Sequence, residues 1–167
     1  MPEIEIRDAR AAEELAAVRA LCMDYRRHLA EHDPMGRVLV DSFYPEAAYA
    51  ETLARLPEGH DAVLLAMAGG SPVGCAMSHA LEDGSCEIKR LYVAPEGRGK
   101  GAARALVQEL LARARARGQS RALLDTMKTL HAARALYLAM GFRECGPYLT
   151  YAPGEAEELC FFEMPLT

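Results

Sequence analysis

The chain of 167 residues has the length of one ordinary domain, so we expect a single domain over residues 1–167. Hydrophobic residues make up 51% and charged residues 26% of the sequence, which excludes a disordered chain and a coiled coil. The formal net charge of -5 disfavours a nucleic-acid binder, because such proteins present a basic face.

No apolar run approaches the roughly 20 residues that a membrane helix needs. Charged residues are interspersed through the first ten positions, where a secretory signal would have an apolar stretch. We therefore expect a cytoplasmic protein that does not enter a membrane. The five cysteines are widely spaced, with no CxxC pair and no histidine at zinc-ligand spacing, so we interpret them as reduced thiols and expect no metal.

The first elements in chain order are a strand and a long helix. Residues 4–7 alternate as a short strand does, and Asp8 is the predicted cap of an Ala- and Leu-rich helix that reaches about His32. A second helix is expected around residues 46–56. The pattern between residues 32 and 60 is interrupted by Pro34, Gly36, Pro45 and Pro57.

Three strands follow in quick succession, at residues 62–68, 72–81 and 86–93. Gly69-Gly70-Ser71 and Asp83-Gly84 separate them, and such residues accept the positive φ of hairpin turns. The sequence therefore predicts an antiparallel meander.

The last third alternates between helices and strands. Apolar residues recur at helical spacing after Gly101, and Gly118 stands where a left-handed cap would end that helix. Residues 121–126 read as a buried strand, and a helix follows that Thr129 would cap and Gly141 would stop. Two more strands are expected at residues 142–145 and 159–164.

The stretch "PEGRGKGAARAL" between the third meander strand and this helix has the composition of an anion-binding loop. The stretch does not match a Walker loop, because Gly101 stands where that motif needs a serine or threonine. A dinucleotide fingerprint fits poorly, because it belongs between parallel strands. The pattern Arg/Gln-x-x-Gly-x-Gly/Ala is satisfied by Arg98, Gly101 and Ala103, and a helix N-terminus attracts phosphate through its free N–H groups.

That pattern is the pyrophosphate signature of the GNAT superfamily of N-acetyltransferases, which this chain resembles. Further stretches look like successive landmarks of bacterial members: "EIKRLYV", "LLDT", "ARALYLAMGFRE" and "GPY". The resemblance covers roughly residue 62 to the end of the chain, and the first sixty residues match only in outline.

The resemblance implies a fold, a reaction and a donor. The expected fold is α/β, with a mixed, mostly antiparallel sheet flanked by helices on both faces and splayed between the fourth and fifth strands. The expected reaction transfers an acetyl group from acetyl-CoA to a primary amine of a small molecule or a protein, without a metal. A homodimer is common among similar proteins.

The resemblance also assigns cofactor-binding residues. The loop would line the pyrophosphate, and the backbone of the preceding strand would bind the pantetheine arm and polarise the thioester carbonyl. These positions are Leu91, Tyr92, Val93, Arg98, Gly99, Lys100, Gly101, Ala102, Ala103 and Arg104.

Two residues are the catalytic candidates. Tyr137 matches the helix tyrosine that many members place near the coenzyme sulfur, where a protonated phenol can supply a proton to the thiolate. Glu87 matches the strand glutamate that histone-modifying relatives use as a base toward the amine. One departure is Leu130, which stands where many relatives carry a cofactor-contacting asparagine.

The acceptor pocket is built largely from the segment where the resemblance is thinnest. Candidate acceptor-binding residues are Tyr25, His28, His79 and Tyr148. Two alternatives stay open: a non-catalytic acyl-CoA-binding regulatory module, and a nucleotide-binding oxidoreductase. Amine-dependent release of CoA thiol distinguishes the enzyme from the first, and NAD(P) binding tests the second.

Overall fold

A seven-stranded sheet forms the centre of the computed structural model, which describes residues 3–167. Its strands are β1 (Ile4–Asp8), β2 (Ala62–Ala68), β3 (Ser71–Ala80), β4 (Cys86–Val93), β5 (Arg121–Met127), β6 (Arg143–Cys145) and β7 (Leu159–Pro165). The helices are α1 (Ala12–His32), α2 (Pro34–Phe43), α3 (Glu46–Ala54), α4 (Ala102–Ala116) and α5 (His131–Ala139), with short 3-10 turns at Pro95–Gly97 and Ala156–Glu158.

The strand order is β1-β2-β3-β4-β5-β7-β6, and β4 and β5 form the parallel pair among antiparallel neighbours. The predicted meander of β2, β3 and β4 is confirmed, as is the mixed, mostly antiparallel sheet. A parallel pair needs a crossover, and α4 supplies it between β4 and β5.

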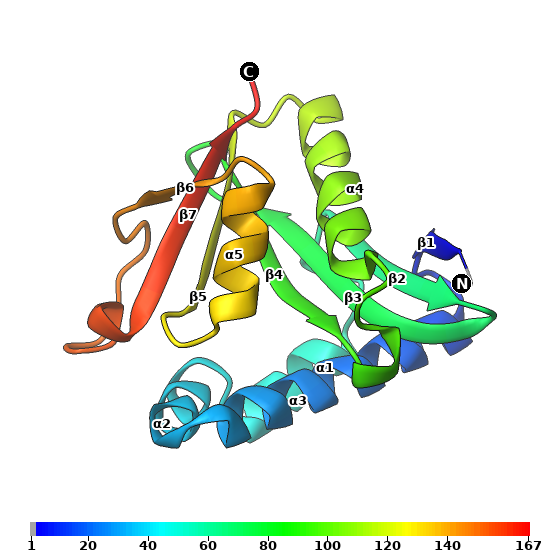
Figure 1. Ribbon diagram of the computed structural model, residues 1–167, viewed down its shortest axis with the longest axis horizontal. Helices are drawn as coiled ribbons and strands as arrows, with labels where there is room; N and C mark the ends of the chain where they lie inside the picture. The colour runs from blue at the N-terminus through cyan, green and yellow to red at the C-terminus, as the bar shows by residue number, and fades with distance from the viewer. Residues whose placement is uncertain (1–2) are drawn as a thin grey trace.

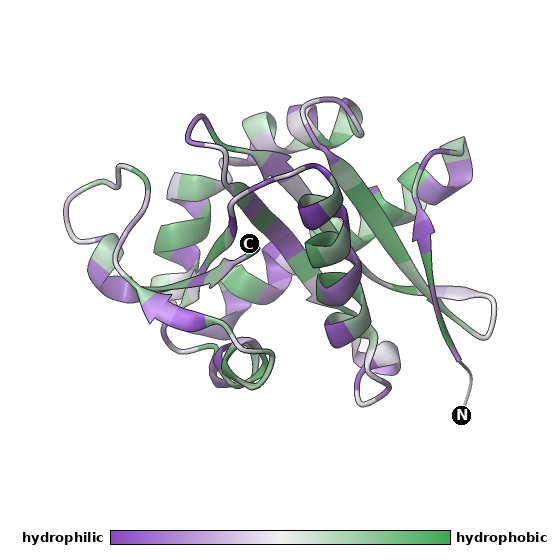
Figure 2. Cartoon of the chain, turned by 90° about the horizontal axis from the view of Figure 1, so that it is seen from above, coloured by the Kyte–Doolittle hydropathy of each residue, from purple (hydrophilic) through white to green (hydrophobic). Residues whose placement is uncertain are grey.

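Helices cover both faces of the sheet, as predicted (Figure 1). One face packs against α4 and α5 around the fully buried Leu106 and Phe162. The opposite face packs against α1 and α3 around Val18 and Leu53. In Figure 2 the central strands are largely green, whereas α4 alternates between green and purple, as an amphipathic helix should.

The sheet opens between β4 and β5. Their ladder consists of two residue pairs, Cys86 with Ala122 and Glu87 with Leu123, and the strands separate beyond them. On its other side β4 carries a bulge, because its register against β3 shifts between Cys75 and Met77. Arg90 lies in this bulge with a φ of 54°, which is uncommon for a residue other than glycine. The predicted splay is therefore confirmed.

Two predicted helix caps are wrong. Asp8 ends β1, where it pairs with Leu64, and its carboxylate forms an ion pair with Arg113. The first helix begins later, with Ala11 as its N-cap. Thr129 does not cap the fifth helix, because its hydroxyl donates to Asp33 Oδ2 at 2.7 Å and Leu130 is the N-cap.

The segment after His32 contains a helix, α2, that sequence reasoning missed. Pro34 stands in its first turn, where a missing N–H costs nothing, and Asp33 caps it by accepting the Gly36 N–H at 2.7 Å. This helix packs against α1 and, through Leu39 and Val40, contributes to a third apolar cluster.

The cysteines within residues 3–167 are all unpaired, and Cys22 and Cys75 bring their sulfur atoms to 3.9 Å in the core. Over the same residues, no group of three or more His, Cys, Asp or Glu side chains is arranged to hold a metal ion. None of the helices in this part of the chain combines the length and the hydropathy needed to span a bilayer.

Candidate active site

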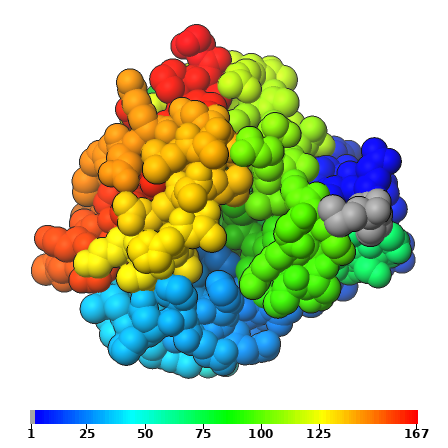
Figure 3. Space-filling model, viewed as in Figure 1, coloured from blue at the N-terminus to red at the C-terminus, as the bar shows by residue number. Residues whose placement is uncertain are grey.

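A cleft of about 500 Å³ occupies the opening between β4 and β5. Its walls come from α1, β4, the start of α4, β5 and α5. In Figure 3 it appears as a hollow between the green residues of β4 and its following loop and the yellow residues around the start of α5, with blue α1 below. The volume is that of a small-molecule site.

The loop after β4 presents backbone donors to one end of the cleft. Gly99 and Gly101 have φ values of 75° and 81°, and a Cβ on either would meet nothing within 4 Å. Ala105 is the first residue of α4 whose N–H bonds back to the chain, to the Gly101 carbonyl at 3.0 Å, so the N–H groups before it are free of helix bonds.

The charge around this helix N-terminus favours an anion. The first turn of α4 carries no acidic residue, and the predicted cations Arg98, Lys100 and Arg104 surround it. Arg98 and Ala103 line the cleft. Lys100 donates to the Glu96 carbonyl at 2.9 Å, which fixes the turn. Free N–H groups, positive charge and small residues are the features that favour binding of a phosphate group.

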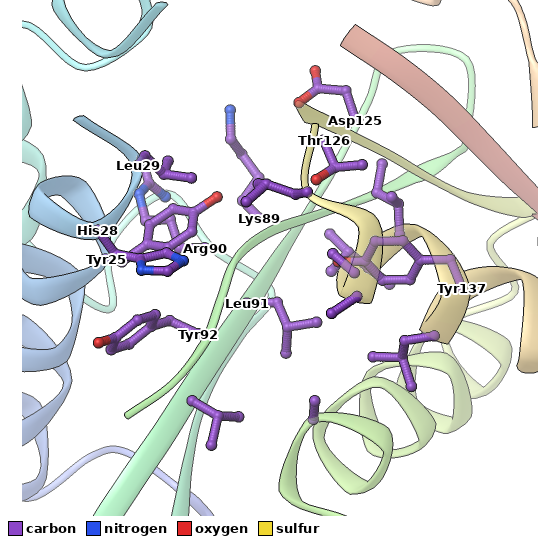
Figure 4. A pocket seen from close by; sticks show the side chains of 18 of the residues that line it. Tyr25, His28, Leu29, Lys89, Arg90, Leu91, Tyr92, Asp125, Thr126 and Tyr137 are labelled. Atoms are coloured by element: carbon purple, nitrogen blue, oxygen red, sulfur yellow. The ribbon is translucent and has the colours of Figure 1, made fainter. Parts of the chain in front are cut away.

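The opened edge of β4 offers polar backbone groups along the cleft. The Arg90 carbonyl accepts a hydrogen bond from the Cys75 thiol of β3 at 3.5 Å. The Leu91 N–H belongs to the same trans peptide and points in the opposite direction, away from β3. The Ala94 N–H donates to the Val73 carbonyl of β3, so the backbone N–H and C=O of Val93 face the opening on the other side of the strand. There the Val93 carbonyl accepts a hydrogen bond from Arg98 Nε at 3.0 Å. The Tyr92 side chain lines the wall toward α1 (Figure 4).

Tyr137 on α5 faces the cleft from the side opposite α1 (Figure 4). Its ring is buried between Phe142 and Phe162, with centroid distances of 5.8 and 5.6 Å, and these contacts fix its direction. Burial, together with the negative charge of Asp125, raises the pKa of Tyr137 well above that of a free phenol. The phenol is therefore protonated at neutral pH.

Glu87 lies at the closed end of the opening, on the last residue pair of β4 with β5. Its Oε1 lies 2.7 Å from His79 Nε2, and its Oε2 accepts the Tyr148 hydroxyl at 2.6 Å. Burial alone would raise the pKa of Glu87, but these two hydrogen bonds and the charge of Lys89 lower it below its usual value. The carboxylate thus stays ionised over the physiological range.

The predicted acceptor-binding residues fall into two groups. Tyr25 and His28 on α1 line the cleft, where both rings pack at a tilted angle against Tyr92, with centroids about 6 Å from its own. His79 and Tyr148 lie outside the cleft wall and contact the site through Glu87. Burial, together with the neighbouring Arg98 and His32 side chains, lowers the pKa of His28, which favours its neutral form.

Sequence reasoning missed several cleft residues, above all Lys89, Asp125, Thr126 and Tyr44. Asp125 follows the buried stretch of β5, in the same "LLDT" landmark that supported the resemblance. The sequence signal that could have identified Asp125 was its position after two apolar residues, near the end of a short strand. Tyr44 ends α2, so its place in the site could not be read without that helix.

Comparisons with known proteins agree with this geometry. Residues 16–142 match the family model described as Acetyltransferase (GNAT) family. The chain is 33% identical over 135 residues to a protein named IAA acetyltransferase of Azospirillum brasilense, a match that covers 80% of this chain and 87% of that one.

Two solved structures share the fold over almost the whole chain. The ribosomal-protein-alanine N-acetyltransferase of Brucella melitensis is 27% identical with a TM-score of 0.66, and the alignment covers 96% of this chain and 99% of that one. PaiA N-acetyltransferase of Thermoplasma acidophilum, solved in complex with coenzyme A, is 17% identical with a TM-score of 0.70, over 98% and 99% of the two chains. The chain described here belongs to the GNAT family of acetyltransferases.

Proposed function

We propose that this enzyme transfers the acetyl group of acetyl-CoA directly to a primary amine, with donor and acceptor bound together in the cleft. The free N–H groups at the start of α4, with Arg98, bind the diphosphate of the coenzyme. The pantetheine arm lies along the opened edge of β4, where Leu91 and Val93 present their backbone groups. The thioester then lies between Tyr137 and β4.

The Leu91 N–H is the group that stabilises the reacting carbonyl in this proposal. It points into the opening, away from β3. When the amine nitrogen bonds to the carbonyl carbon, negative charge develops on the carbonyl oxygen, and a fixed N–H dipole in a site of low dielectric stabilises it. The C–S bond then breaks, and Tyr137 supplies the proton that the thiolate takes up.

Glu87 is the proposed proton acceptor for the acceptor amine. An ammonium group has no lone pair and cannot attack a carbonyl, so one proton must leave before the C–N bond forms. The Glu87 carboxylate is ionised and borders the cleft, and it would take this proton through a water molecule. His79, which lies 2.7 Å from Glu87 and is partly exposed, links the carboxylate to solvent.

The observation that carries this proposal is the convergence on one opening of three features. These are an anion-binding helix start, an unpaired strand edge and a buried phenol that is protonated at neutral pH. A regulatory module that only binds acyl-CoA requires the first two features but has no use for the third. The relatives named above differ in their acceptors, so the acceptor has to be inferred from this chain's own cleft.

The test is a panel of primary amines incubated with the protein and acetyl-CoA, with release of CoA thiol followed by a thiol reagent. Release that depends on both enzyme and amine, with an acetylated amine identified by mass spectrometry, is expected. Slow hydrolysis that no amine stimulates would instead identify an acyl-CoA-binding module.

A further inference from the structure

Asp125 is a carboxyl group in the cleft to which the mechanism above gives no role. It stands on β5 two residues beyond Leu123, the last residue paired with β4, so it borders the opening directly. Among the described residues it accepts one side-chain hydrogen bond, from the Tyr151 hydroxyl to Oδ2 at 3.1 Å. Its second oxygen is therefore available to a ligand.

Beside Asp125 the cleft continues into an apolar recess of about 80 Å³. Its apolar lining comes from α1, α2, the end of β5, the β5–α5 connection and β7: Leu29, Leu39, Val40, Phe43, Met127, Leu130 and Leu159. The residues that line both cavities, and so mark where they join, are Tyr25, Leu29, Tyr44, Lys89, Asp125, Thr126 and Leu130. Asp125 is the acidic side chain at this junction.

The two charged groups at the junction differ in their partners. The closest partners of Lys89 are Glu87, whose Oε1 lies 3.9 Å away, and the Tyr44 ring, whose centre lies 5.8 Å away. Asp125 has no cationic side chain within 4 Å among residues 3–167. A partly buried carboxylate that is not in direct contact with a cation gains from a ligand ammonium group that can pair with it.

We propose that Asp125 binds the ammonium group of the acceptor, that the recess holds an apolar body attached to it, and that the acceptors are therefore hydrophobic monoamines. This inference rests on the proposed function and narrows it to one class of substrate. The recess would hold a short alkyl chain or one aromatic ring between Leu29, Leu39 and Tyr44. Asp125 acts as a binding residue, and Glu87 remains the proton acceptor.

Two further features agree with this class. The charge of Asp125 reaches Tyr137, whose pKa it helps to raise, so an amine held at Asp125 lies in the same cleft as the proton donor. Lys89 lies at the same junction, and its positive charge would repel a second ammonium group. A polyamine or a lysine-rich peptide should therefore be a poor acceptor.

The experiment compares hexylamine and phenethylamine with spermidine and a lysine-containing peptide, by steady-state kinetics at saturating acetyl-CoA. For the wild-type enzyme, kcat/KM should be about tenfold or more higher for the two monoamines. Asp125→Asn, which keeps the shape of the side chain, should raise KM for the monoamines about 10- to 100-fold and leave the Kd for acetyl-CoA unchanged. Asp41→Asn removes an exposed carboxylate from α2 and should change neither the KM for the monoamines nor the Kd for acetyl-CoA.

A second variant tests the recess itself. Leu159 lines the recess but not the main cleft, so Leu159→Phe should narrow it without touching the cofactor end. We expect kcat/KM for phenethylamine to fall in this variant. The low kcat/KM for methylamine, which has no apolar body, should stay unchanged.

The outcomes separate the two proposals. If no amine of any class stimulates thiol release, the proposed function itself is overturned. If spermidine or the peptide is acetylated at least as well as the monoamines, or if Asp125→Asn leaves KM for monoamines unchanged in a folded protein, the acceptor class is wrong and the acetyltransferase stands.

Discussion

At the scale of single residues, burial prepares the side chains of this site for their chemistry. The Tyr137 phenol is held between two phenylalanine rings, and its raised pKa keeps the hydroxyl protonated over the physiological pH range. In the proposed mechanism the hydroxyl donates a hydrogen bond to the departing thiolate and supplies the proton that the thiolate takes up. Glu87 is affected in the opposite direction, because hydrogen bonds and Lys89 outweigh its burial and keep it ionised.

Tyr137→Phe isolates the hydroxyl, because phenylalanine keeps the ring contacts with Phe142 and Phe162. We expect kcat to fall about 10²- to 10⁴-fold, as is usual for the loss of a general acid. The Kd for acetyl-CoA, measured by calorimetry, should change less than threefold. Equal turnover of the two proteins would remove Tyr137 from the mechanism.

Glu87 also couples the stability of the fold to pH. Its pKa in the folded protein lies below its unfolded value of about 4.3, so it contributes stability above that pH. This contribution is lost as the pH falls through the folded pKa. The difference in melting temperature between wild type and Glu87→Gln should therefore be largest from about pH 5 upward and shrink toward pH 3.

The measurement is a series of thermal melts of both proteins between pH 3 and pH 8. A difference that does not depend on pH would mean that Glu87 is not the ionised group described above. In activity assays at pH 7.5, Glu87→Gln should lower kcat about 10²-fold or more if the carboxylate is the proton acceptor.

At the scale of secondary-structure elements, α4 has a positive-φ glycine at each end. Gly101 is its N-cap at φ 81°, and Gly118 follows its C-cap at φ 74°; a Cβ at either position has open space around it. Both positions therefore require a positive φ, but of the two glycines only Gly101 borders the proposed diphosphate site. Gly118 is thus a matched control for the backbone strain that a substitution at Gly101 causes.

Gly101→Val and Gly118→Val should each destabilise the protein by about 1–2 kcal/mol, since both place a branched side chain at positive φ. We expect Gly101→Val to abolish acetyl-CoA binding in calorimetry, because its side chain would fill the space in front of the free N–H groups. Gly118→Val should bind with wild-type affinity. Unchanged binding by Gly101→Val would count against this loop as the cofactor site.

The contact between α1 and α2 depends on Gly36. A Cβ at this position would lie 2.1 Å from the Leu29 carbonyl oxygen, an atom of the helix backbone that cannot move independently. Gly36→Ala should lower the free energy of unfolding by about 1–3 kcal/mol, as overpacking does, despite the higher helix propensity of alanine. Arg37→Ala, at the next and exposed position, is the control in urea unfolding. A gain in stability for Gly36→Ala would show that this contact is looser than described.

The elements of residues 62–167 could be predicted because local signals agreed with the fold. Turn glycines separated β2, β3 and β4, and the apolar period of α4 ended at Gly118. The segment of α2 could not be read, because Pro34 and Gly36 look like helix breakers. Pro34 occupies a helix start, and Gly36 is required by a close contact with the Leu29 backbone of the preceding helix, which depends on how the two helices pack.

The same distinction applies to the site. The cofactor loop is a continuous stretch whose spacing of glycines and cations is visible in the sequence. Asp125, Lys89 and Tyr44 come from β5, β4 and the end of α2, and their proximity arises where two strands separate. A sequence pattern does not contain that separation, so the acceptor side of the site had to come from the structure.

At the scale of the whole molecule, the proposed site has a donor side and an acceptor side, which lie at the two ends of the opening in the sheet. The core around α4 and α5 supports the cofactor loop and Tyr137, while α1 and α2 cover the acceptor recess. The opening between β4 and β5 connects the two sides, so both substrates can meet in one cleft. Although the net charge is -5, the cations around the start of α4 provide a local positive field for the diphosphate.

The position of acetyl-CoA in a crystal structure of the complex tests this account most directly. We predict a diphosphate hydrogen-bonded to backbone N–H groups of residues 98–104, and a pantetheine arm lying between β4 and β5. The thioester carbonyl should accept the Leu91 N–H, with the Tyr137 hydroxyl beside the sulfur. Acetyl-CoA bound elsewhere, with its diphosphate away from the start of α4, would contradict the account.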